Sequence, residues 1–242
     1  MFKLLIAASG SKANATLVIH NDKAVLIDCG TSYKALCEAL GSAGLSPSDI
    51  AAVLVTHSHS DHTKGLATFS KKLSVPFYSG VDICGCEKFC GGLDMCGMHI
   101  TPFCCSHDVD CVGYKISADG KTLAVATDTG IVTDCMLSEL TGCDAVMLEC
   151  NHDTEMLRCG PYPYQLKQRI ASTEGHLSNT DCAKTLTHLA VNGTKTAVLA
   201  HLSETNNTPL VAMHTVRNEL SKYGLENKMK LYCADTLTQI EL

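Results

Sequence analysis

The sequence predicts a protein of the α+β class, and three observations support this prediction. The chain has 242 residues, of which 45% are apolar, enough to bury a full core in one large domain covering residues 1–242. Short runs rich in β-branched residues recur along the chain and predict strands. Between several of these runs, apolar residues follow the spacing of a helix with one buried face.

The first part of the chain predicts five strands and two helices. The predicted strands cover residues 2–8, 15–20, 24–28, 51–55 and 75–79. A helix is predicted from 31 to 43, where Gly44 is a typical helix end, and another from 63 to 72. The segment from about residue 82 to 111 is rich in cysteine and glycine and follows neither period. We therefore expect that segment to be irregular.

The second part of the chain predicts further strands and three helices. The strands are expected at residues 112–116, 123–127, 145–148, 196–200, 229–233 and 237–240. One helix is expected shortly before His176, and a second begins at Ser178 or Asn179, which are good N-cap residues. The last helix starts at Pro209 and ends near Gly224.

The cysteine content is high, with 15 cysteines, but the number is odd and no export signal is visible. Free thiols in a reducing cytoplasm are the better interpretation, and no stretch is long enough for a membrane span. We therefore expect a cytoplasmic protein with no membrane partner. The cluster from Cys84 to Cys111 leaves an additional zinc or iron–sulfur site open, although it contains no C-x-x-C pair.

The densest group of polar residues follows the strand that ends at Val55. His57, His59, Asp61 and His62 stand within six residues of one another. In an extended segment the first three lie on one side, and a turn into the next helix can bring His62 to the same centre. Imidazole and carboxylate without thiolate are the ligands of a hydrolytic Zn²⁺ or Mn²⁺ site.

Other positions along the chain also carry residues that suit such a site. Asp28, Asp128, Glu149 and His201 stand at the ends of predicted strands, whereas His107 precedes a predicted strand and His176 precedes a predicted helix. Asp128 is a candidate for a bridging ligand, because one carboxylate can hold two cations. Near the first strand, the loop from Ser9 to Asn14 either presents backbone N–H groups to an anion or is an ordinary turn.

The motif His57-x-His59-x-Asp61-His62, with the later His, Asp and His, resembles the metallo-β-lactamase superfamily. This resemblance implies a four-layer αβ/βα sandwich with a two-metal site. The match extends to the YycJ/WalJ-like family, related to the tRNase Z and RNase J phosphodiesterases, through further motifs. These are Ser9-Gly10-Ser11-x-x-Asn14, Thr127-Asp128-Thr129-Gly130, Glu149-Cys150-Asn151-His152-Asp153, Gly175-His176-Leu177-Ser178-Asn179 and His201-Leu202-Ser203.

The resemblance implies a binuclear metal-dependent phosphodiesterase acting as a 5′-to-3′ DNA exonuclease, in which a hydroxide bridging the two ions attacks phosphorus. Metal coordination lowers the pKa of water to about 7. Metal one would take His57, His59 and His107. Metal two would take Asp61, His62 and His201, with Asp128 shared. His176 would act on the phosphate, Glu149 would orient His176, Asp61 would act as a ligand and catalytic group, and Asp28 would support the ligands.

The nucleic-acid substrate, DNA in preference to RNA, requires groups that hold bases and phosphates. Tyr162, Tyr164, Lys167 and Arg169 lie on one predicted helix before His176 and suit this task, although they equally suit a solvated helix face. Ser9, Ser11 and Asn14 are further candidates. The net charge of −6 argues against binding by bulk electrostatics; two divalent ions would reduce it to −2.

Two other functions compete with this interpretation. The first is a hydrolase of glyoxalase II or lactonase type, which shares the metal ligands but has no need for His176 with Glu149. The second is a non-catalytic metal-binding regulator, which gains nothing from an open coordination position. The sequence leaves open the oligomeric state and the choice between Zn²⁺ and Mn²⁺.

Overall fold

A computed structural model describes residues 2–235 and 237–242 of the chain. The chain divides into two compact units, each made from separate stretches of sequence. Unit 1 contains residues 1–102, 109–121 and 234–242, and unit 2 contains residues 103–108 and 122–233. The expectation of one domain over the whole chain remains a prediction.

Unit 1 is built on a mixed sheet with the strand order β14-β1-β2-β3-β4-β5-β6. Its strands are β1 (Phe2–Ala8), β2 (Ala15–His20), β3 (Lys23–Ile27), β4 (Ile50–Val55), β5 (Phe77–Ser79), β6 (Glu87–Lys88) and β14 (Thr238–Glu241). The strands from β1 to β3 are antiparallel, whereas β3, β4, β5 and β6 run parallel. The carboxyl ends of β3 and β4 therefore meet at one edge.

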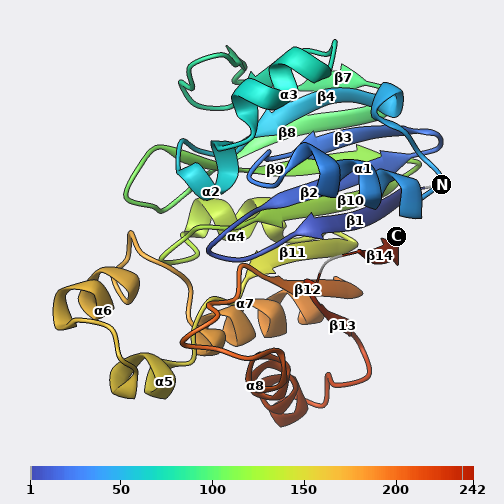
Figure 1. The fold of residues 1–242 in the computed structure, drawn as a ribbon. Coiled ribbons are helices and arrows are strands. Elements are labelled where there is room, and N and C mark those ends of the chain that lie inside the picture. Colours follow the sequence, from blue (N-terminus) through green and yellow to red (C-terminus); the bar gives the residue numbers. More distant parts are fainter. Residues whose placement is uncertain (1, 236) are drawn as a thin grey trace. The chain divides into compact units, whose positions relative to one another are not determined.

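Helix α1 (Tyr33–Ser42) covers one face of this sheet, as Figure 1 shows. Its buried residues Leu36, Ala39 and Leu40 follow helical spacing and pack with the apolar side chains of β1 to β4. Ser32 caps the helix by accepting a hydrogen bond from the Ala35 N–H (3.1 Å). A 3₁₀ turn (Pro47–Asp49) precedes β4, and the short helices α2 (Ser60–Thr63) and α3 (Leu66–Lys72) follow it.

Part of the cysteine-rich segment is regular, so the expectation of an irregular segment over 82–111 is wrong there. Strands β7 (Leu93–Met95) and β8 (Met98–Cys105) form an antiparallel hairpin, and β9 (Cys111–Ala118) follows. Cys96 and Gly97 both have positive φ, as a tight two-residue hairpin turn requires. The structure records each cysteine as a free thiol.

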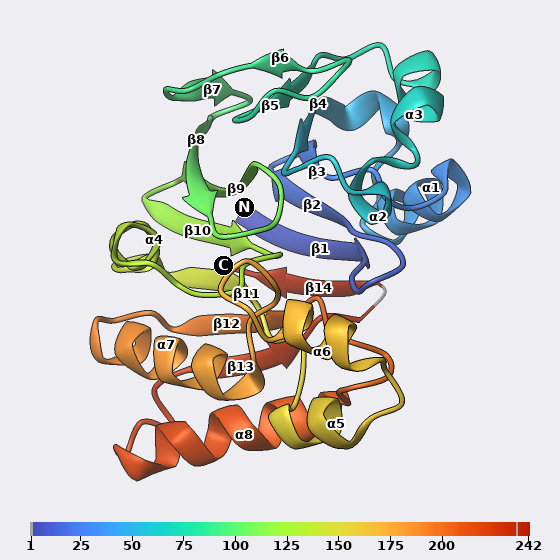
Figure 2. The ribbon, with the colours of Figure 1, turned by 90° about the vertical axis from the view of Figure 1, so that its left-hand side faces the viewer.

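Unit 2 is built on the parallel strands β10 (Lys121–Ala126), β11 (Ala145–Glu149), β12 (Thr196–Ala200) and β13 (Lys230–Cys233). Helices α7 (Asn179–Val191) and α8 (Pro209–Lys222) lie along these strands (Figure 2). Their apolar faces join those of β11 and β12 in one core. The remaining helices are α4 (Asp134–Leu140), α5 (Thr154–Cys159) and α6 (Tyr164–Ile170).

The polar residues at the carboxyl ends of the parallel strands lie at one edge of the unit 2 sheet. Ala126 is in register with Leu148, and Leu148 is in register with Leu199, so the three strands end at the same level. No helix in the described part of the chain combines the length and apolar character needed to cross a membrane.

Candidate metal centre

The first ligand set, His57, His59, Asp61 and His62, lies at the end of β4 in unit 1. His57 and His62 are buried, and His59 and Asp61 are half-buried. The ring centroid of His57 is 4.7 Å from that of His59 and 4.2 Å from that of His62. Helix α2 begins at Ser60, earlier than the sequence predicts, so that Asp61 and His62 already belong to it. The three imidazole rings thus lie close together, and their role as metal ligands remains a prediction.

Asp28 supports this set from the end of β3. Its carboxylate accepts hydrogen bonds from the Thr56 N–H (2.9 Å) and the Thr56 hydroxyl, and its Oδ2 lies 2.7 Å from Nδ1 of His62. The carboxylate thus holds the Nδ1 proton of His62, which leaves Nε2 with the lone pair that a metal requires. Asp28 has a φ of 63°, a left-handed conformation that aspartate tolerates better than most residues.

Asn14 lies inside the same group of contacts. Its amide nitrogen is 2.9 Å from Nε2 of His62 and 3.2 Å from Oδ2 of Asp61, and its side-chain oxygen accepts from the Gly10 N–H (3.0 Å). Asn14 is buried, Ser9 is half-buried and Ser11 is exposed. Asn14 therefore positions the ligands and the loop after β1, while substrate binding by Ser9, Ser11 and Asn14 stays a prediction.

Gly30 allows the backbone of this turn to close on itself. A Cβ atom at Gly30 would lie 1.5 Å from the carbonyl oxygen of Asp61 and 2.8 Å from the backbone nitrogen of Asn14. Gly30 donates its N–H to the Asn14 carbonyl (2.9 Å), and Asn14 donates its N–H to the Asp61 carbonyl (2.8 Å). Only glycine allows these three stretches of backbone to approach so closely.

We expect Gly30→Ala to displace the turn that carries Asp61 and His62, because the added methyl group overlaps backbone atoms that have no room to move. The matched control is Gly41→Ala, whose Cβ meets nothing within 4 Å on the exposed side of α1. Alanine in a helix is about 0.5–1 kcal/mol more stable than glycine, so the control should be neutral or stabilising. Thermal unfolding and metal binding of both variants test this, and equal behaviour would contradict it.

The second ligand set, His107, Asp128 and His201, lies in unit 2 together with Glu149 and His176. Asp128 comes two residues after β10, Glu149 ends β11 and His201 follows β12 directly. In the group formed by Asp128, Glu149, His176 and His201, one ligand atom from each residue lies within 4.8 Å of the others. Asp128 and His201 both have positive φ, 55° and 56°, which turns their side chains away from the strand direction.

Glu149 is the organising residue of this set. It is fully buried, and its Oε1 accepts hydrogen bonds from Nδ1 of His176 (2.8 Å) and Nδ1 of His201 (2.7 Å). Oε2 accepts the backbone N–H groups of Thr129 (2.8 Å) and Leu177 (3.1 Å). Burial alone raises the pKa of Glu149, but the charges and hydrogen bonds of the two histidines outweigh it and lower that pKa to about 2. Glu149 therefore stays ionised and orients both rings.

Two histidines of this set, His176 and His107, differ in their environments. Burial lowers the pKa of His176, yet the charge and hydrogen bond of Glu149 outweigh it, so that its net pKa is raised. Burial outweighs the attraction of Asp128 and lowers the pKa of His107, whose Nδ1 lies 3.1 Å from the Gly175 carbonyl oxygen. His107 is thus a neutral ring, and its Nε2 lies 3.9 Å from Oδ1 of Asp128. Neutral imidazole is the form that binds a metal ion.

The donor atoms in both units fit hydrolytic divalent cations. They are imidazole nitrogens and carboxylate oxygens, and no group in the described part of the chain that is spaced to hold a metal contains a cysteine. Carboxylates hold His62 and His201 through Nδ1, which is the arrangement that metal-ligating histidines commonly show.

Comparison with known proteins assigns the family. Residues 9–84 match the metallo-beta-lactamase superfamily, and residues 93–202 match the beta-lactamase superfamily domain. Exodeoxyribonuclease WalJ of Streptococcus pneumoniae serotype 2 is 34% identical over 261 aligned positions, covering 99% of this chain and 97% of WalJ. The chain belongs to the YycJ/WalJ-like family of the metallo-β-lactamase superfamily.

Two further relatives agree with this assignment. Exodeoxyribonuclease YycJ of Bacillus anthracis is 36% identical over 235 positions, covering 90% of this chain and 89% of YycJ. The crystal structure of the metallo-beta-lactamase fold protein YhfI from Bacillus subtilis has a TM-score of 0.76 at 17% identity, covering 99% of this chain and 98% of YhfI. The predicted fold class, α+β with the metallo-β-lactamase sandwich, is confirmed.

The supporting roles of several residues escaped the sequence analysis. Thr56 and Thr129 bind the carboxylates of Asp28 and Glu149, and Asn151 donates its side-chain amide to the His201 carbonyl (2.8 Å). Thr56 follows β4 directly, and Thr129 and Asn151 belong to motifs in which the sequence assigns them no role. Their partners are far away in the chain, so spacing alone does not reveal them.

We expect Asp28→Asn to weaken metal binding about 10- to 100-fold, because His62 loses the charged acceptor of its Nδ1 proton. Asparagine keeps the left-handed backbone, so the turn itself should persist. Titration of the metal-free protein with Zn²⁺ or Mn²⁺ against a chromophoric chelator measures the effect. Asp22→Asn, in an exposed turn, is the matched control. Unchanged affinity in the first variant would show that Asp28 does not tune the ligands.

Proposed function

We propose that this protein is a binuclear metal-dependent phosphodiesterase that degrades DNA from an end. The two ligand sets would hold the ions as the family resemblance implies. Metal one would take His57, His59 and His107; metal two would take Asp61, His62 and His201; Asp128 would be shared. The single observation that carries the proposal is the Glu149–His176 pair beside Asp128. The names of WalJ and YycJ support DNA as the substrate.

Bound Zn²⁺ or Mn²⁺ would supply an activated water molecule and neutralise charge that develops on the phosphate. The protein itself would contribute the proton that the leaving group needs. His176 holds a proton on Nδ1 against Glu149, and its raised pKa favours the imidazolium form, which can donate from Nε2. The side chain of His176 is 23% exposed, so this donor is accessible to a substrate oxygen. Transfer to the leaving alkoxide is the role that fits.

Asp61, held by Asn14, would act on a cation and on a water molecule. Asp61 is half-buried, and its Oδ2 lies 3.4 Å from Nε2 of His62 and 3.2 Å from the Asn14 amide. A carboxylate in this place can ligate a cation through one oxygen and accept a hydrogen bond from water through the other. Asp61 is therefore both ligand and catalytic residue in our proposal.

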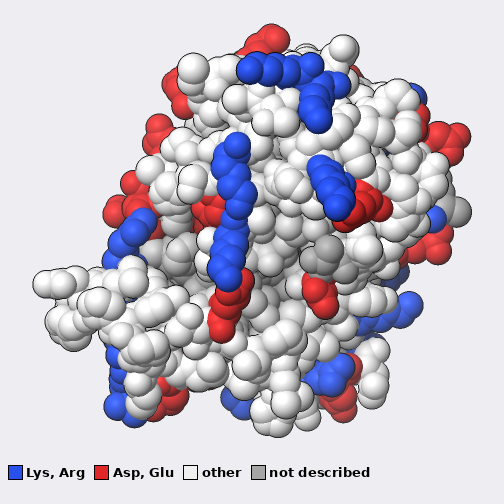
Figure 3. Space-filling model, in the orientation of Figure 1, with Lys and Arg blue, Asp and Glu red and all other residues white. Residues whose placement is uncertain are grey.

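The charge distribution argues against binding of DNA through a broad basic surface. On the face shown in Figure 3, the Lys and Arg side chains are dispersed and several lie next to Asp or Glu. The net charge of −6 agrees with this view. Affinity for DNA would then come from the metal ions and from contacts with the terminal nucleotides, not from the charge of the whole surface.

The predicted substrate helix is α6, and its residues differ in their contacts. Tyr162 precedes the helix, because Pro163 stands at its N-cap. Arg169 forms an ion pair with Asp108, whereas Nζ of Lys167 donates to the Arg158 carbonyl (2.8 Å). Binding of substrate by Lys167 and Arg169 remains part of the proposal, and Lys167 has the less neutralised charge.

We expect the purified protein, supplied with Zn²⁺ or Mn²⁺, to release nucleotides from one end of labelled DNA. Parallel reactions with DNA labelled at the 5′ or the 3′ end, and with RNA, establish polarity and sugar preference. Bis(p-nitrophenyl) phosphate and S-lactoylglutathione serve as small substrates. Hydrolysis of S-lactoylglutathione alone would favour the glyoxalase II-like alternative, and no hydrolysis with either metal would favour a regulatory metal site.

We expect His176→Ala to lower kcat for DNA about 10²- to 10⁴-fold while both metals stay bound, because the variant loses its proton donor. Metal content measured on the same sample separates this effect from loss of the ions. His188→Ala, an exposed histidine on α7, is the matched control and should cleave normally. Wild-type cleavage by the first variant would remove His176 from the mechanism.

A further inference from the structure

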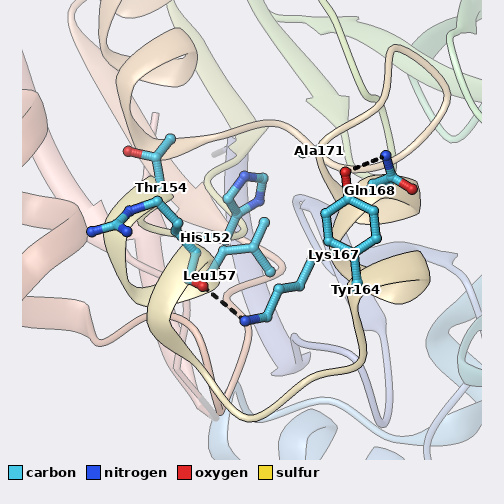
Figure 4. A pocket seen from close by; sticks show the side chains of 8 residues that line it. His152, Thr154, Leu157, Tyr164, Lys167, Gln168 and Ala171 are labelled. Atoms are coloured by element: carbon cyan, nitrogen blue, oxygen red, sulfur yellow. Dashed lines mark hydrogen bonds between the residues drawn. The ribbon is translucent and has the colours of Figure 1, made fainter.

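A pocket lies between α5 and α6 in unit 2, outside the metal ligands (Figure 4). Its volume is about 360 Å³, within the range of small-molecule sites. The side chains that define it include His152, Leu157, Tyr164, Lys167 and Gln168. Its lining is largely apolar, with a few polar groups, which is typical of sites for flat organic ligands.

His152 lines this pocket and carries a ring nitrogen without a hydrogen-bond partner. The residue is 2% exposed, and its Nδ1 has no hydrogen-bond partner among the described residues. Its backbone is held in place, because the carbonyl accepts the Asn179 N–H (2.8 Å). Buried polar atoms in proteins nearly always have a partner, so a ring that lines a pocket and carries a bare nitrogen points to a ligand. A neutral imidazole can donate or accept a hydrogen bond there.

Tyr164 gives the pocket an aromatic wall. This side chain is 73% exposed, an unusual position for a large ring, and Gln168 donates to its hydroxyl (3.0 Å) from one helical turn away. Figure 4 shows the Tyr164 ring on one side of the pocket, with Leu157 and His152 on α5 and just before it. An aromatic face opposite an apolar side chain suits a planar, stacking ligand.

Lys167 adds a positive charge at the rim. Its Nζ donates to the neutral Arg158 carbonyl, and in the described part of the chain it forms no ion pair. The hydrogen bond also ties α6 to the end of α5, and so keeps the two walls of the pocket together. The group that enters should therefore combine a flat ring with a negative charge.

Short stretches of chain connect the residues of the pocket with Glu149 and with the catalytic histidine, His176. His152 follows Glu149 by three residues, and the His176 N–H donates to the carbonyl of Ile170 (2.9 Å), the last residue of α6. The charges of Glu149 and His176 both act on His152, as neighbours would. A nucleotide whose base fills the pocket thus keeps its phosphate close to His176.

We infer that this pocket binds one nucleobase of the DNA strand, stacked on Tyr164 and hydrogen-bonded to the His152 ring, with Lys167 facing an adjoining phosphate. The inference deepens the proposed function and rests on it for the identity of the strand. The pocket sets the register of the strand at the centre of cleavage. Stacking makes binding tolerant of sequence, while the His152 contact adds a modest preference among bases.

The test compares loss of the side chain with loss of the base. Tyr164→Ala should raise KM about fivefold or more for DNA with an intact end, the lower limit for loss of one stacked base. With an oligonucleotide that carries an abasic residue at the attacked end, KM should already be raised, and the variant should change it less than about twofold. Tyr223→Ala, at the exposed end of α8, is the matched control. Equal effects of Tyr164→Ala on both substrates would overturn the inference.

A second measurement separates this inference from the proposed function. The fluorescence of 2-aminopurine deoxyriboside 5′-monophosphate, which a phosphodiesterase does not cleave, should be quenched by the metal-loaded protein and not by Tyr164→Ala. Quenching without any DNA cleavage would refute the proposed function and retain the base pocket. Cleavage of DNA with quenching that is absent, or equal in protein and variant, would refute the pocket and retain the proposed function.

Discussion

The hydrogen bond between a buried carboxylate and the Nδ1 atom of a histidine is the interaction on which both units depend. In unit 1 it joins Asp28 to His62, and in unit 2 it joins Glu149 to His176 and His201. A buried carboxylate is costly unless hydrogen bonds satisfy its oxygens. Here backbone N–H groups, the Thr56 hydroxyl and imidazoles do so, and the contacts to His62 and His201 also select the tautomer that offers Nε2 outward. The same bonds thus stabilise the fold and prepare the ligands.

The carboxyl ends of strands carry the strain that this arrangement requires. Asp28, Asp128 and His201 follow β3, β10 and β12, and all three adopt left-handed φ values. For residues other than glycine this conformation costs about 1–2 kcal/mol each. Continued extended backbone would carry each side chain to one face of its sheet, so the left-handed turn redirects it over the sheet edge. Strain concentrated at such positions is typical of functional sites.

Separate residues in unit 2 perform separate tasks. Glu149 is fully occupied by hydrogen bonds and remains ionised, so it orients groups and does not exchange protons. His176 is partly exposed and has a raised pKa, so it can exchange one. His152, three residues after Glu149, is neutral and buried, and lines a pocket. The motif that begins with Glu149 at the end of β11 thus contains both the residue that orients the proton donor His176 and the residue that lines the proposed base pocket.

The sequence by itself determined the strands that are continuously apolar and the motifs that follow them. Strands β1, β2 and β12 have the predicted bounds, because short, largely apolar runs bounded by turn residues favour an extended, buried segment. Local crowding of histidine and aspartate was sufficient to locate the first ligand set. Only the tertiary structure decided that Met98–Cys105 is a strand, since Pro102 interrupts the run and the segment pairs with a hairpin partner. It also decided the close packing at Gly30, the four groups on Glu149 and the bare nitrogen of His152. Those features join residues far apart in the chain, and spacing along a sequence carries no information about such contacts.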